Sequence, residues 1–220
     1  MDQYFEKIKT EIIKQIESEE YQLAFGKSEQ GVIDKNHALE VVMITEKLWN
    51  ENESKPFPQA LKIAALVHDS DRFYPRRMVD TKDCPEDQYE YRKGIHSGNT
   101  AIIFQEMFKD ILPIEIIRDI CFLILRHEHG GDQKKDRSLT EKQDEHTNTY
   151  NLNKAANYLF YADKLSFFYS NIYEYSKRGE EKLKKKVIFS LEGLPISIKE
   201  KIKSISYDNE LIKRVVNGCL

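Results

Sequence analysis

Apolar residues recur at steps of three and four along most of the chain, which is the period of an amphipathic helix. The run "LKIAALV" that follows Pro58 is apolar on nearly all sides, which is typical of a helix buried in the middle of a bundle. No alternating strand pattern of convincing length appears, so the predicted fold class is all-α, a compact multi-helix bundle. The pattern predicts helices over residues 4–16, 37–48, from Pro58 onward, 96–109, 114–129, 152–178, 180–190 and, as one or two helices, 196–217.

Two segments interrupt this helical period. Residues 72–93 are rich in charge, tyrosine and proline, and residues 128–151 are polar, contain two glycines and show no periodicity. Both segments predict loops. The second is long for a loop inside a domain, so we expect it to lie on the surface near the site that the helices build.

The length, composition and net charge of the chain place few limits on its function. A chain of 220 residues with 40% hydrophobic content can bury one substantial core. Its 34 basic and 37 acidic residues give a net charge of -3, which disfavours nucleic acid and anionic membrane as general partners. The three cysteines lie far apart without a C-x-x-C pair, so we expect neither a disulfide framework nor a thiolate zinc site, and the reducing cytoplasm fits best. No apolar run approaches the length of a membrane span.

Ionisable residues lie where the helical period places the core. His37, His68, His127 and Asp163 each continue an apolar stripe, and each falls on a different predicted helix. A buried carboxylate without a cation is very costly, and a metal ion shared by several helices would neutralise it. Taken singly, each histidine could instead be a core residue hydrogen-bonded to a backbone carbonyl, and each aspartate a helix-end residue.

The order of these residues resembles a known family. His37, the adjacent pair His68 and Asp69 at the end of an apolar helix, and Asp163 in "LFYADKL" resemble the H…HD…D signature of the HD-domain metal-dependent phosphohydrolases. The resemblance covers roughly residues 30–170 and implies an all-helical HD domain whose divalent metal these four residues hold. We expect an N-terminal helix packed on the core over residues 1–29, the HD domain over 30–175 and a C-terminal helical extension over 176–220.

A subset of that family adds two histidines and a second metal. His96 in "GIHSGNTA" and His127 in "ILRHEHGG" match this layout, which resembles dinuclear members that include bacterial hydrolases splitting diadenosine tetraphosphate symmetrically. For His96, near a predicted helix start, a capping or surface role is the alternative. His129 would face away from His127 on a regular helix. The implied cofactor is one or two divalent ions, with iron, manganese, cobalt, nickel, zinc and magnesium as candidates.

Basic residues near the HD pair fit a phosphate substrate. A divalent ion makes water acidic enough to act as a nucleophile near neutral pH, and Asp69 is the carboxylate expected to hold and orient that water. Arg72 stands where many family members carry lysine and others glutamate, which favours a phosphate clamp. Arg76 and Lys164 are substrate-binding candidates, with an exposed loop charge and an ordinary surface lysine as the alternatives. Asp71 could instead hold Arg72 in an ion pair.

These features predict a cytoplasmic phosphohydrolase acting on a small phosphorylated molecule, with a nucleotide or a dinucleoside polyphosphate as the favoured substrate. A phosphodiesterase of the same family and a non-catalytic metal- or nucleotide-binding regulatory module are the alternatives. Gly130 and Gly131 are followed by Asp132, so the glycine-tyrosine-proline motif of cyclic-dinucleotide enzymes is absent. The helices beyond about residue 180 could cover the pocket or form a homodimer contact.

Overall fold

The computed structural model describes residues 2–19, 21, 28–73, 89–128 and 150–220, and every regular element in these ranges is helical. The predicted all-α fold is therefore confirmed. Within the same ranges no helix is both long enough and apolar enough to cross a membrane. The elements are α1 (Asp2–Ile16), α3 (Ser28–Asn52), α4 (Gln59–Val67), the 3-10 turn η1 (Ser70–Phe73), α5 (Tyr89–Phe108), α6 (Ile114–Arg126), α7 (Leu152–Ser166), the π-helical turn η4 (Phe167–Asn171), α8 (Ile172–Ser176), α9 (Glu180–Leu191), α10 (Ile196–Lys203) and α11 (Glu210–Cys219).

The chain forms two compact units, Met1–Phe160 and Tyr161–Leu220, and each is described by itself. The division falls between Phe160 and Tyr161, within the residues of α7. The domain boundaries expected near residues 30 and 175 stay predictions.

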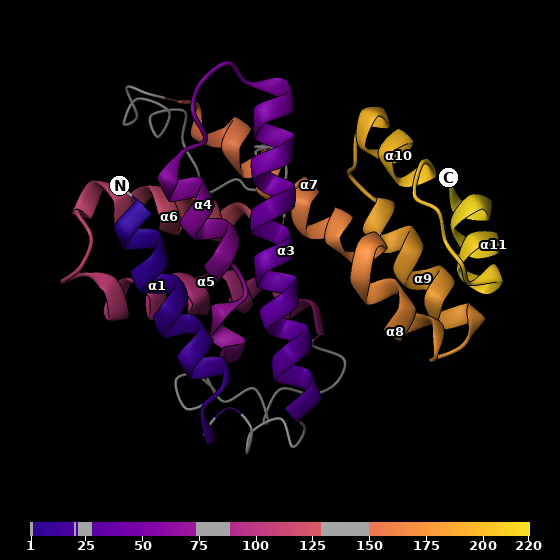
Figure 1. The fold of residues 1–220 in the computed structure, drawn as a ribbon, viewed down its shortest axis with the longest axis horizontal. Helices are drawn as coiled ribbons and strands as arrows, with labels where there is room; N and C mark the ends of the chain where they lie inside the picture. The colour runs from indigo at the N-terminus through magenta and orange to yellow at the C-terminus, as the bar shows by residue number, and fades with distance from the viewer. Residues whose placement is uncertain (1, 20, 22–27, 74–88, 129–149) are drawn as a thin grey trace. The chain divides into compact units, whose positions relative to one another are not determined.

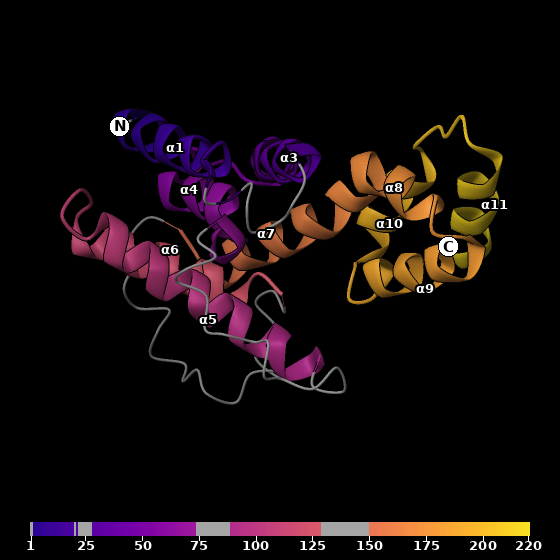
Figure 2. The same ribbon diagram turned by 90° about the horizontal axis from the view of Figure 1, so that it is seen from below.

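Helix α4 is the centre of the first unit (Figures 1 and 2). It contacts α1 and α3 as well as α6, and α5 packs in turn on α6. Seven of its nine residues are buried, because small alanines and branched aliphatic residues leave no polar face. The prediction of a central buried helix is thus confirmed. Burial of each large aliphatic side chain contributes about 2 kcal/mol, so the HD pair that follows Val67 starts from a rigid base.

The helices differ from the predicted ones in several places. Helix α5 begins at Tyr89, so His96 lies inside the helix and the expected helix start near residue 96 was wrong. Helix α6 ends at Arg126, before His127. The helix predicted over 152–178 contains the π-helical turn Phe167–Asn171. Side-chain period identifies helices well, but it is insensitive to where a helix ends and to one extra residue in a turn.

In the second unit, α9 contacts α8 and α11. Gly179 precedes α9 with a φ of 97°, a conformation that glycine adopts without strain. Asn209 caps α11, because its side-chain oxygen accepts hydrogen bonds from the backbone N–H groups of Leu211 and Ile212. The roles suggested for these C-terminal helices, covering a pocket or forming a dimer contact, stay predictions.

Candidate metal centre

His68 follows directly on the last residue of α4. The final carbonyl groups of a helix lack intrahelical donors, and the His68 Nδ1–H donates to one of them, the Ala65 oxygen, at 2.9 Å. A carbonyl oxygen can only accept, so this bond places the ring proton on Nδ1 and leaves the Nε2 lone pair on the opposite side of the ring. The side chain is 1% exposed. The helix end therefore presents Nε2 as a ligand atom in a fixed orientation.

His127 repeats this arrangement at the end of α6. Its Nδ1–H donates to the Ile124 carbonyl oxygen at 2.6 Å, and the residue is buried. The ring centroids of His68 and His127 lie 5.2 Å apart. The alternative considered for single histidines, a hydrogen bond to a backbone carbonyl, is thus real for both. It orients these rings and is compatible with a ligand role for Nε2.

The Asp69 carboxylate lies among the histidines. Its Oδ1 is 3.7 Å from His68 Nε2 and 3.8 Å from His127 Nε2, and its Oδ2 is 3.9 Å from His37 Nε2. These separations are too long for hydrogen bonds. They suit atoms that share an ion, since two ligands at about 2.1 Å from one ion lie at most about 4.2 Å apart.

His96 approaches Asp69 more closely than the other histidines do. On α5, its Nε2 hydrogen-bonds Asp69 Oδ1 at 2.7 Å, and its Nδ1 hydrogen-bonds Asp71 Oδ2 at 2.7 Å. Burial favours the neutral ring and lowers its pKa, but hydrogen bonds and charge from Asp69 and then Asp71 outweigh burial and raise the pKa of His96 to about 10. His96 is therefore no surface or capping residue.

Asp71 lies beside the candidate ligands, whereas its sequence context suggested only an ion pair with Arg72. Its side chain is 4% exposed and engages His96. The ion pair suggested with Arg72 falls on a side chain outside the described part of the chain. The D-x-D spacing of Asp69 and Asp71 was visible in the sequence, but its meaning depends on the packing of η1 against α5.

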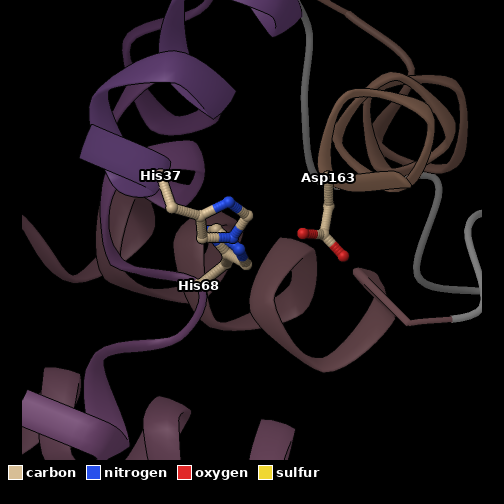
Figure 3. Close-up of side chains that lie close together, drawn as sticks. All are labelled: His37, His68 and Asp163. Atoms are coloured by element: carbon tan, nitrogen blue, oxygen red, sulfur yellow. The ribbon is translucent and has the colours of Figure 1, made fainter. Parts of the chain in front are cut away.

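Two groups of side chains could each hold an ion. One comprises Asp69, His96 and His127, and the other comprises His37, His68 and Asp163; in each group the ligand atoms lie within 4.8 Å of one another. In the second group, the carboxylate of Asp163 on α7 faces the rings of His37 and His68 (Figure 3). All six residues implied as ligands by the family resemblance thus belong to one of the two groups.

The donor set fits divalent metal. Imidazole nitrogens and carboxylate oxygens suit iron, manganese, cobalt, nickel and zinc. The Nδ1–H bonds of His68 and His127 supply the outer support that metal-binding histidines usually have. Asp69 lies within 4 Å of histidines from both groups, so its carboxylate oxygens would be available to an ion held by either group.

Of the other residues that the sequence singled out, only Lys164 has a described side chain. Arg72 lies in η1, but its side chain is outside the described residues, and Arg76 and His129 lie wholly outside them. The Lys164 ammonium donates to the carbonyl oxygens of Phe189 at 2.8 Å and Glu192 at 2.9 Å. These contacts close the C-terminal end of α9, so a substrate phosphate would have to compete with them.

Comparison with known proteins identifies one family. Residues 35–167 match the family model of the HD domain, a span that contains all six candidate ligands. The chain has no match among curated proteins, and it has none among solved structures.

Proposed function

The chain belongs to the HD-domain family, and from this premise we propose that it is a metal-dependent phosphohydrolase that hydrolyses a phosphate ester or anhydride of a small molecule. The proposed substrate class is a nucleotide or a dinucleoside polyphosphate. The resemblance of the six-ligand pattern to dinuclear family members supports this choice. The cytoplasmic location and a homodimer stay predictions.

One observation carries the proposal. The Asp69 carboxylate lies 2.7 to 3.9 Å from the Nε2 atoms of His37, His68, His96 and His127, which come from four different parts of the helical bundle. An anionic group surrounded by imidazoles in a buried position is what a metal centre requires. A structural core would need neither the carboxylate nor so many histidines.

The proposed roles of the residues follow from their positions. A bound divalent ion would act as a Lewis acid and make a water molecule acidic enough to ionise near neutral pH. Asp69 would accept a hydrogen bond from that water and orient it, while the backbone partners of His68 and His127 hold their rings in fixed orientations. Arg72, which lies in η1, is proposed to neutralise the phosphate oxygens during attack.

A metal and substrate screen tests the proposal. Purified protein is analysed for bound metals and then loaded with manganese, iron, cobalt, nickel, zinc or magnesium. Each form is assayed on nucleoside mono-, di- and triphosphates, on dinucleoside polyphosphates and on generic phosphodiesters. Turnover of a phosphate ester or anhydride that depends on metal and disappears in Asp69→Ala supports the proposal.

The same screen separates the alternatives. Activity confined to phosphodiesters would identify a phosphodiesterase of the family. Metal binding without turnover of any substrate class would favour a regulatory module. Absence of divalent metal binding would overturn the proposed function at its first step.

A further inference from the structure

We infer that Asp71 is a positioning residue for the second ion, acting through the ring of His96. The inference rests on the proposed function and extends it, because it assigns a residue that is not itself in either ligand group. Asp71 would hold the His96 imidazole in one tautomer and one orientation, so that Nε2 is directed at the ion shared with Asp69 and His127.

The primary contact is short and buried. Asp71 Oδ2 accepts from His96 Nδ1–H at 2.7 Å, and the two side chains are 4% and 13% exposed. Because this bond uses Nδ1, the other ring nitrogen is the one that can face an ion. A carboxylate behind a metal-binding imidazole raises its basicity as well as fixing its ring.

A second contact holds the backbone of Asp71. The backbone N–H of Asp71 donates to the Thr100 hydroxyl at 3.4 Å, and Thr100 is fully buried one turn after His96 on α5. The side chain and the backbone of Asp71 thus contact neighbouring positions on one face of α5. These two contacts define how η1 is placed along α5, and hence where His96 stands relative to Asp69.

Asp71 differs from the groups that support the other rings. His68 and His127 use backbone carbonyls three residues earlier, which come with the helix end itself. His96 lies inside a helix, where backbone carbonyls are already bonded, so it needs a side-chain acceptor. Asp71 Oδ1 is buried and makes no hydrogen bond within the described part of the chain. A buried carboxylate kept with one oxygen unsatisfied is costly, which is consistent with selection for a site role.

The test measures each ion separately. The full chain is stripped with a chelator and titrated with Mn²⁺ against a competing chelator, for wild type, Asp71→Ala, Asp71→Asn and the control Asp119→Ala. Asp119 accepts a hydrogen bond from Tyr150 at 3.0 Å, so the control also deletes a partly buried carboxylate from the helical bundle. The protein loaded with Zn²⁺ is used to observe the His96 Nδ1–H by nuclear magnetic resonance.

We expect wild type to bind two ions. Asp71→Ala should weaken one of them by about tenfold to a hundredfold, leave the other within about twofold, and lose the slowly exchanging Nδ1–H signal. Asp71→Asn should fall between wild type and Asp71→Ala, because its amide oxygen still accepts from Nδ1–H while the negative charge is gone. Asp119→Ala should keep both affinities.

Failure of the role inferred for Asp71 and failure of the proposed function would give different results. Two tight ions in wild type and unchanged affinities in Asp71→Ala would overturn the role of Asp71 and leave the proposed function standing. An equal loss of both ions in Asp71→Ala would also overturn it, since a general structural defect would produce that result. Wild type that binds no divalent ion would remove the proposed function together with the inference.

Discussion

His68 and His127 are held in the same way: each follows the last residue of its helix, α4 or α6, and each donates its Nδ1–H to the carbonyl oxygen three residues earlier. Their ring centroids are 5.2 Å apart, and both Nε2 atoms lie within 3.8 Å of Asp69 Oδ1. Two helix ends thus direct two imidazole nitrogens toward one carboxylate. The backbone carbonyl groups near the ends of α4 and α6 therefore contribute to the geometry of this centre together with its side chains.

Asp69→Ala should abolish metal-dependent stabilisation. In wild type, a divalent ion at a hundred times its dissociation constant should raise the free energy of unfolding by about 2.7 kcal/mol. The variant lacks the carboxylate that lies beside all four histidines, so we expect little or no such increase and no turnover. Thermal unfolding with and without Mn²⁺ measures this. Full metal stabilisation in Asp69→Ala would contradict the assigned position of the ions.

His96→Ala and His37→Ala should remove different ions. The two residues belong to different ligand groups, so each variant should retain about one of two ions while Asp69→Ala retains neither. Elemental analysis after dialysis gives the stoichiometry. If His96→Ala kept both ions, His96 would be a structural residue and the centre would hold its ions without it.

Much of this centre was predictable from the sequence because its parts have local signals. The apolar run "LKIAALV" predicted that α4 is buried, and the HD pair at its end indicated two candidate ligands. His37, His127 and Asp163 continued apolar stripes, which placed them inside a bundle. The family resemblance then related residues that are far apart in the chain, and the match over residues 35–167 confirms it.

The missing parts depend on geometry that periodicity does not report. The Nδ1 partner of His127 exists because α6 ends at Arg126, whereas the helix was expected to continue to residue 129. The contact of Asp71 with His96 joins positions 25 residues apart, and only the packing of η1 on α5 brings them together. The carbonyl partners of Lys164 likewise come from a helix more than one element away.

Lys164→Met should reduce the stability of the C-terminal unit. The methionine keeps an apolar stem but removes the ammonium that closes the end of α9. We expect a loss of about 1 kcal/mol in the free energy of unfolding, as for a typical hydrogen bond, with metal content unchanged. Urea unfolding measures the free energy of unfolding. A severalfold rise in KM in the same variant would support the predicted substrate contact, and an unchanged KM would reject it.

Arg72→Ala should slow turnover without loss of metal. A guanidinium that neutralises developing charge typically contributes about 3 kcal/mol, or about a hundredfold in kcat. Arg72→Lys should recover only part of that loss, because an ammonium cannot match a phosphate with two parallel hydrogen bonds. Kinetics and elemental analysis on the same preparations check both statements. Loss of metal from Arg72→Ala would show that the residue acts on the metal centre.

His96 should make the chelator-treated protein less stable as pH rises above neutrality. Its pKa in the folded chain is raised to about 10 from an ordinary value of 6.5, so the folded state holds a proton that the unfolded state has released. The stabilisation is fully present below pH 6.5, declines between that value and pH 10, and is absent above it. The slope should approach about 1.4 kcal/mol per pH unit. Urea unfolding of wild type and His96→Gln at pH 7, 8 and 9, with chelator present, measures the difference. Parallel curves for the two proteins would show that His96 does not carry this proton.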